Sequence, residues 1–145
     1  MLLPSCLPDY LPSRHLDRKL DQRDVIGRWV LTGRGAEALG ANGVASVDRP
    51  NSAIRIEENG TCGFQGYSFA ADAFLDVRGT WTLEYGVEHR RGGAPLNVLE
   101  MNVARANGQS AVERMYFREE NGRLIMWRPF GDPDRRQFVE YEHER

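Results

Sequence analysis

The C-terminal third of the chain is predicted to consist of strands separated by tight turns. Two turns contain Asn-Gly, at Asn107-Gly108 and Asn121-Gly122, and a third is Gly131-Asp132-Pro133-Asp134. Asn-Gly is the strongest short-range hairpin signal, because a type I′ turn needs positive φ at both central residues. We therefore predict an antiparallel meander of four strands, at Leu96–Ala104, Ser110–Glu119, Arg123–Phe130 and Arg136–His143.

Four further strand patterns precede this meander. The run from Asp24 to Thr32 is rich in β-branched and aromatic residues, and residues 52–57 and 61–69 flank another Asn-Gly turn at Asn59-Gly60. Eight short strands joined mostly by hairpins favour closure, because a closed barrel has no exposed sheet edge. The sequence predicts an all-β fold, an eight-stranded antiparallel up-and-down barrel, with strands near residues 25–32, 52–58, 61–69, 78–86, 96–104, 110–119, 123–130 and 136–143.

The first residues, 1–23, are predicted to form a lead in front of the barrel domain, which spans residues 24–145. Within the lead, Ser13 is expected to begin a short helix that ends near Gln22. Leu16 and Leu20 stand four residues apart on this helix and would cover an open end of the barrel. The longer connections are predicted as loops: residues 33–51, with one helical turn around 36–39, residues 70–77 and residues 88–95.

Composition limits the classes of partner. The 145 residues suit one domain with a single core. A formal net charge of −2 and a pI near 5.9 leave no basic excess to neutralise phosphates, so nucleic acid is not expected as a partner. No run approaches the roughly 20 apolar residues that a membrane-spanning helix requires.

No arrangement of residues typical of an enzyme stands out. His15, His89 and His143 have no spacing that would make a metal site, and Cys62 has no identifiable base partner. The motifs of serine hydrolases, phosphate-binding loops and zinc proteases are absent. We predict that the protein is not an enzyme and binds no metal or cofactor.

The N-terminal residues Leu3-Pro4-Ser5-Cys6 resemble the end of a bacterial lipoprotein signal, which leads to a lipidated cysteine. If Cys6 carries a lipid, the protein is anchored in the cell envelope and touches the membrane only through that lipid. If Cys6 is an ordinary N-terminal residue, the protein is expected in the cytoplasm. An exported protein could also join Cys6 to Cys62 in a disulfide.

Gly27-Arg28-Trp29 is similar to the Gly-x-Trp motif that opens the first strand of lipocalins and related calycin barrels. The resemblance extends over about residues 24–145 through the order of strands and the hairpin rhythm. It implies a barrel whose base is closed by Trp29, with Arg128 or Arg114 from a late strand packed over the indole. It also implies that the loop after the first strand caps a ligand mouth.

The leading hypothesis for function is a binding protein that holds a small apolar or amphipathic ligand inside the barrel. The alternating strand patterns turn six side chains toward that interior, namely Trp29, Trp81, Leu83, Tyr85, Met101 and Met115. Arg128 shares a face with Leu124 and Met126 and is expected near a barrel end. There it would meet an anionic ligand group, or a carboxylate such as Glu100 or Glu113.

The rival hypothesis is a protein-interaction module, of an envelope accessory or inhibitor type, with a filled barrel. Residues 123–130 are apolar on both faces, which indicates that both faces of this strand are covered. Tyr116 and Trp127, if they point outward, would anchor a partner, because aromatic residues dominate interface energetics. The alternative is that the chain's own lead covers them. The sequence leaves the oligomeric state open.

Overall fold

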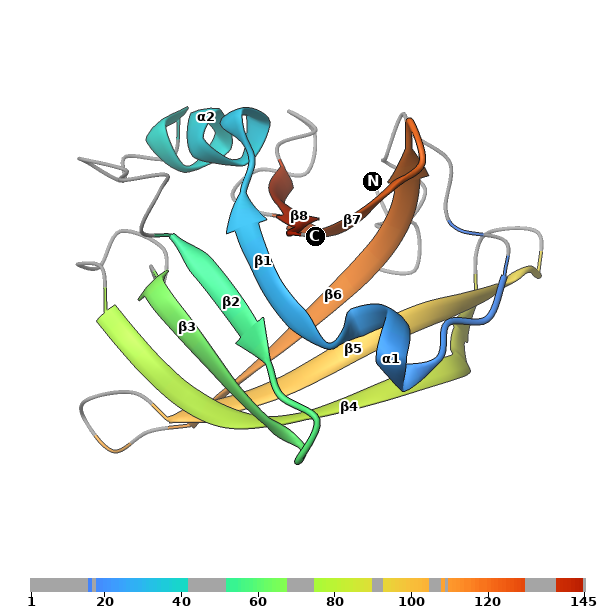
Figure 1. Ribbon diagram of the computed structural model, residues 1–145, viewed down its shortest axis with the longest axis horizontal. Helices are drawn as coiled ribbons and strands as arrows, with labels where there is room; N and C mark the ends of the chain where they lie inside the picture. Colours follow the sequence, from blue (N-terminus) through green and yellow to red (C-terminus); the bar gives the residue numbers. More distant parts are fainter. Residues whose placement is uncertain are drawn as a thin grey trace, which may run out of the picture.

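The computed structural model describes residues 16, 18–41, 52–67, 75–89, 93–104, 108, 110–129 and 138–144. Its strands are β1 (Gly27–Leu31), β2 (Ala53–Ile56), β3 (Thr61–Tyr67), β4 (Leu75–His89), β5 (Pro95–Ala104), β6 (Ser110–Glu120), β7 (Arg123–Pro129) and β8 (Phe138–His143). Within the described ranges the helices are α1 (Gln22–Val25) and α2 (Gly33–Ala41). Each strand pairs antiparallel with the next, and β8 pairs with β1, so the sheet closes into an eight-stranded barrel (Figure 1). The predicted fold is confirmed.

Some predictions concern residues outside the described ranges. These are Cys6 and its lipid, the cover that residues 1–15 would give, the loop from 42 to 51, and the predicted strand ends at 68–69, 130 and 136–137.

The first helix lies later in the chain than predicted. Residues 18–21 are not helical, and α1 occupies Gln22–Val25, part of which was expected in the first strand. A capping box explains the position: the backbone N–H of Asp21 donates to the Asp24 carboxylate at 2.8 Å, and the Asp21 side chain accepts from the Asp24 backbone. The helix therefore begins after Asp21, and β1 follows it directly (Figure 1).

Two other elements are longer than predicted. α2 spans nine residues where one helical turn was expected, and Thr32 caps it by accepting a hydrogen bond from the Gly35 N–H at 3.0 Å. β4 begins within the predicted loop 70–77 and ends within the predicted loop 88–95. Its two ends are formed by the pairs Tyr67 with Leu75 and His89 with Pro95, each of which follows a shift of register. The alternation of apolar and polar residues does not reveal such shifts, so the sequence did not predict these ends.

The interior is one apolar core to which every strand contributes. Inward positions include Ile54 and Ile56 as predicted, and the inward face of β3 proves to be that of Cys62 and Phe64. Leu16 and Leu20 belong to the same core, although they do not reach it from the helix that was predicted for them. The side chain of Asn97 fixes this segment. It accepts from the Leu20 N–H and donates to the Arg18 carbonyl, both at 2.8 Å.

A second apolar cluster lies on the outer face of β5 to β8. It consists of Leu96, Val98, Tyr116, Trp127 and Phe138, and the Trp127 ring packs 5.0 Å from Tyr116 and 5.2 Å from Phe138. The two-sided apolar pattern of β7 therefore corresponds to burial on both faces, as predicted. Trp127 has no exposed surface and Tyr116 is 9% exposed, so they are not the exposed anchors that the interaction hypothesis placed here.

Glycines mark two close approaches of backbone to backbone. A Cβ at Gly79 in β4 would lie 1.8 Å from the Asn102 carbonyl oxygen in β5. A Cβ at Gly35 in α2 would lie 2.7 Å from the Glu140 carbonyl oxygen in β8. Only glycine lets β4 bend against β5 and α2 rest on β8 at these distances.

We expect Gly79→Ala to lower the free energy of unfolding by about 1–3 kcal/mol, because the methyl group forces β4 and β5 apart. Gly63→Ala in β3 is the matched control, since its Cβ would meet no atom closer than the Val77 carbonyl oxygen at 3.7 Å. Urea unfolding of both variants measures the difference. Equal stability of the two would contradict the argument from close approach.

Candidate functional site

The predicted ligand-binding side chains are only partly brought together. Trp81 lies opposite Met101 in the register of β4 and β5, and Leu99 next along β5 lies opposite Met115 in β6. Trp29, Trp81, Met101 and Met115 belong to one core cluster, and Leu83 packs against it half-buried. The structure thus gathers most of the predicted set on the inward face.

Tyr85 is the exception, because it continues the alternation of Trp81 and Leu83 but does not lie in the buried interior. Its side chain is 37% exposed. Asn97, which pairs with Tyr85 in the register, binds the backbone of Arg18 and Leu20. The interior is therefore already closed where β4 reaches Tyr85, and the strand runs on beyond the core.

The interior is packed around the predicted ligand residues. A hollow that could hold a ligand would leave the side chains around it accessible to a water-sized sphere. Five inward side chains at the middle of the barrel have no exposed surface at all: Leu99, Met101, Met115, Met126 and Val139. At these residues the space is filled by other side chains, as in the core of any closely packed domain.

Trp29 closes the start of the barrel with partners of its own. Its indole N–H donates to the Val25 carbonyl of α1 at 2.8 Å. The ring that stacks on it is that of His143, with centroids 4.4 Å apart and planes at 14°. The resemblance to lipocalins implied an arginine at this place, but Arg114 lies exposed and pairs with Glu100 at 3.2 Å. Gly27, at φ +127°, leaves room for the imidazole, since a Cβ there would lie 2.9 Å from its Nε2.

Arg128 lies on the inward face near the end of β7, as predicted. Its Nε atom is 3.5 Å from a carboxylate oxygen of Glu113, one of the two partners expected for it. The two side chains are 12% and 16% exposed. Tyr141 interacts with both charges, and burial raises the pKa of its hydroxyl to about 12. This pair is the polar end of an otherwise apolar interior.

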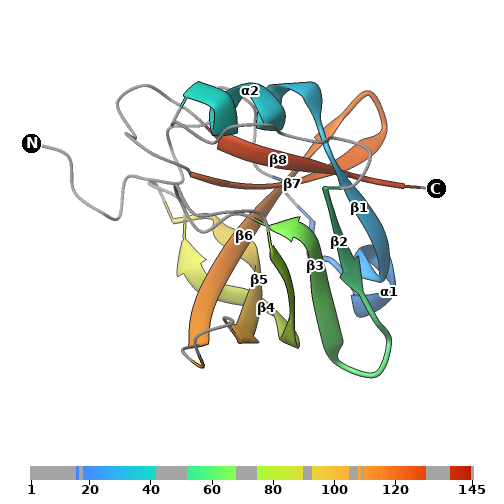
Figure 2. The same cartoon turned by 90° about the vertical axis from the view of Figure 1, so that its left-hand side faces the viewer.

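A polar hollow lies outside the barrel, between α2 and the outer face of β6 to β8. α2 rests along β8 (Figure 2). We call this hollow the α2 groove. It has a volume of about 680 Å³ and is lined by Thr32, Gly33, Arg34, Glu37, Arg118, Glu120, Asn121, Arg123, Ile125, Glu140 and Glu142.

A buried ion pair forms part of the wall of the α2 groove. Arg118 Nη1 lies 2.8 Å from Glu140 Oε1, and the two side chains are only 1% and 4% exposed. Arg118 also donates through Nη2 to Glu120 at 2.9 Å, which holds the pKa of Glu120 below its ordinary value. Arg34 on α2 reaches both carboxylates, Glu120 at 3.2 Å and Glu140 at 3.8 Å. Four charges thus connect α2, β6 and β8.

Arg118 is not fully satisfied by these contacts. Its Nε and Nη1 atoms are buried and have no acceptor in hydrogen-bonding geometry among the described residues, although Nη1 is within ion-pair distance of Glu140. Buried polar atoms without partners are uncommon and mark places where an additional polar group can bind. Arg118 and Glu140 were missed in the sequence because both occupy outward strand positions, which alternation assigns to solvent.

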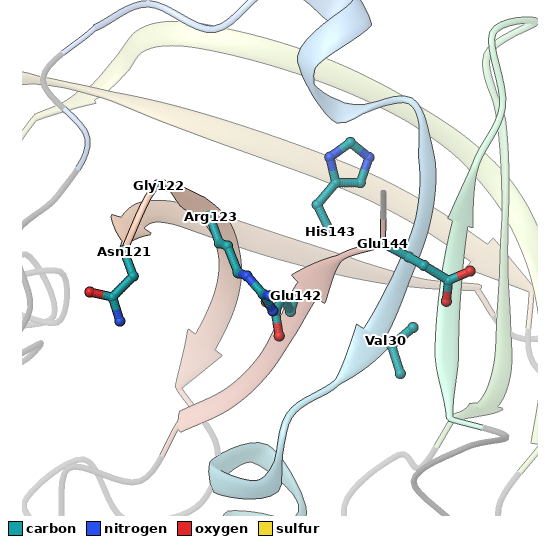
Figure 3. Close-up of a pocket in the computed structure, with 7 residues that line it drawn as sticks. All are labelled: Val30, Asn121, Gly122, Arg123, Glu142, His143 and Glu144. Atoms are coloured by element: carbon teal, nitrogen blue, oxygen red, sulfur yellow. The ribbon is translucent and has the colours of Figure 1, made fainter.

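A second hollow of about 480 Å³ adjoins the α2 groove and shares Asn121, Arg123 and Glu142 with it. Its other lining residues are Val30, Gly122, His143 and Glu144. Figure 3 shows Arg123 reaching toward Glu142, with which it forms an exposed ion pair, while the His143 ring points away from both. Together the two hollows form a continuous polar surface over β7, β8 and the start of α2.

This surface offers charged binding groups of both signs. Four of its carboxylates, Glu120, Glu140, Glu142 and Glu144, are held in ion pairs. Cys62 lies on the inward face of β3, where burial raises the pKa of its thiol to about 11, so it is protonated at neutral pH. It is a free thiol, and Cys6, the partner considered for it in a disulfide, lies outside the described residues. Among the described residues no three potential metal ligands gather into a site.

Comparison with known proteins adds no assignment. No protein-family model, curated protein or solved structure matches the chain. The helices of the described ranges are all too short or too polar to cross a lipid bilayer.

We expect Glu140→Gln to lower the free energy of unfolding by about 3 kcal/mol, because it removes the buried one of the two carboxylates that pair with the Arg118 guanidinium. Glu142→Gln, two residues along the same strand, is the matched control. It breaks the exposed pair with Arg123 and should cost less than about 1 kcal/mol. Urea unfolding compares the two, and similar costs would show that Glu140 contributes no more than a surface charge.

Proposed function

We propose that the chain is a non-catalytic protein-interaction module, a packed barrel that binds its partner on the outer surface through the α2 groove. The observation that favours this over a ligand carrier is the complete burial of Met101 and Met115, at the centre of the predicted ligand pocket. Side chains in that state touch protein atoms on all sides, so a ligand would have to displace them. Hollows of about 680 and 480 Å³ lie on the outer surface.

The lining of the α2 groove suits a protein partner. Small-molecule pockets are mostly apolar with a few polar groups. The α2 groove instead carries three guanidinium groups and four carboxylates, from Arg34, Arg118, Arg123, Glu37, Glu120, Glu140 and Glu142. Interspersed charges of both signs complement a protein surface that is itself of mixed charge. Such complementarity fixes how the two surfaces align and disfavours other partners.

Native mass spectrometry of the protein purified from its host tests this proposal. We expect a protein partner bound in fixed stoichiometry and lost on denaturation. Glu37→Arg should abolish the complex, because it reverses an exposed charge on the α2 side of the groove that makes no ion pair in the structure. Arg114→Glu, which reverses an exposed charge on β6 outside the groove, should leave the complex intact. Loss of the complex in both variants, or in neither, would contradict the assignment to the α2 groove.

The Arg128–Glu113 pair favours a second candidate function, the carriage of an amphipathic ligand. Both side chains are inward, charged and partly accessible, so they could meet a polar head group while the tail displaces apolar side chains. This function would make use of Trp81 and Leu83, which line the interior beside Met101.

Titration with dodecanoate, followed by tryptophan fluorescence, separates the two functions. For a packed barrel we expect no saturable change, because Trp29 and Trp81 stay buried among protein atoms. A saturable change that disappears in Arg128→Met, with the variant's unfolding curve showing that it remains folded, would support the carrier instead.

A further inference from the structure

Three arginines and a glycine form a row across the outer face of β1 to β4. Arg28 lies directly opposite Arg55, Arg55 opposite Gly63, and Gly63 opposite Arg78. These strands are not those of the α2 groove: β2 and β3 lie on the side of the barrel away from β6 and β7 (Figures 1 and 2). The row is therefore a separate surface.

The row is electrostatically unfavourable as it stands. Like charges directly opposite each other on a sheet repel. Arg28 is paired with Glu144, and Arg55 lies 3.7 Å from Glu57. Arg78 is exposed and has no carboxylate partner within the described part of the chain. Among the described side chains, the three arginines of the row thus face two carboxylates, and the arginine without one lies at the β4 end.

Gly63 leaves a slot in the middle of the row. Two hollows, of about 290 and 410 Å³, meet there, and both are lined by Arg55, Gly63 and Arg78. A side chain would fit at this position, because a Cβ would lie no closer than 3.7 Å to another atom. Packing therefore does not require glycine, although glycine weakens a strand. Because position 63 has no side chain, only backbone atoms form the surface between Arg55 and Arg78.

The spacing across the slot suits one small anion. Neighbouring strands are about 4.8 Å apart, so Arg55 and Arg78, two strands apart, stand roughly 10 Å from each other at the backbone. Side chains of this length can converge over Gly63 from both sides. Guanidinium groups bind phosphate, sulfate and carboxylate through two parallel hydrogen bonds each. Gln65, exposed beside the slot, adds an amide donor.

We propose that Arg55 and Arg78 bind one oxyanion group of a small molecule over Gly63, with Arg28 adding positive charge from β1. The bound group supplies the counter-charge that the row lacks and relieves the repulsion between its arginines. A small molecule fits better than nucleic acid, because the row spans four strands only and the chain carries a net charge of −2.

Isothermal titration of the full chain with inorganic phosphate, sulfate and acetate, at about 0.01 M ionic strength where screening is weak, tests the proposal. We expect saturable one-to-one binding of at least one anion. The order of the three affinities shows whether the site prefers a phosphate, a sulfate or a carboxylate group. Arg55→Gln and Arg78→Gln should each weaken binding by at least about tenfold, since each removes charge-assisted hydrogen bonds. Arg114→Gln, an exposed arginine on β6, should leave binding unchanged.

Two further measurements separate binding from a structural role. Gly63→Val should abolish binding by filling the slot without changing any charge. Arg78→Gln should raise the melting temperature in the absence of the anion and remove the rise that the anion causes in the wild type. No saturable binding of any of the three anions would overturn the proposal, as would equal binding by wild type and Arg78→Gln. Because the α2 groove lies on other strands, this result is independent of whether Glu37→Arg abolishes the protein complex.

Discussion

Closure of the sheet between β1 and β8 is the constraint on which the rest of the structure depends. At this seam Trp29 pairs in register with His143 and stacks on its ring, and the imidazole Nε2 lies 2.9 Å from the Ile26 carbonyl. The same indole binds α1 through the Val25 carbonyl. One aromatic pair therefore joins the first strand, the last described strand and the helix that precedes them. Without this seam, both edges would be exposed and the core would be open to water on one side.

In the proposed function, the closed barrel is a scaffold and its outer wall carries the interactions with other molecules. The middle of the interior is occupied by methionine and aliphatic side chains with no exposed surface, so it contributes stability and shape. The polar groups are placed on the wall: the network around Arg118 and Glu140 under α2, and the arginine row on β1 to β4. These two surfaces use different strands of one rigid scaffold. Their chemistry also differs, since one is balanced in charge and the other has an excess of positive charge.

The parts predicted from the sequence are those governed by local rules. Turn residues located the hairpins, and alternation identified the inward faces of Trp29, Met101 and Met115 as well as the inward position of Arg128 beside Glu113. What could not be predicted depends on elements distant in the sequence. Arg118 and Glu140 occupy outward positions that are nevertheless buried, next to α2, and for α2 only one helical turn within a loop was expected. Tyr85 follows the alternation but lies beyond the point at which Asn97 and the lead close the interior.

The β1–β8 seam also has a consequence for the order of events in folding. Its partners Ile26 and His143 are 117 positions apart, whereas the other strand pairs join neighbours in the chain. Contacts of such separation form late, because the entropy of closing a long loop must be overcome before they contribute. Until then the hairpins from β2 to β7 form a curved open sheet with two free edges. In a concentrated solution those edges can pair with another copy of the chain, and β8 of one molecule can complete the barrel of a second. Slow formation of this single seam therefore favours an exchanged dimer among the misfolded products of such a barrel.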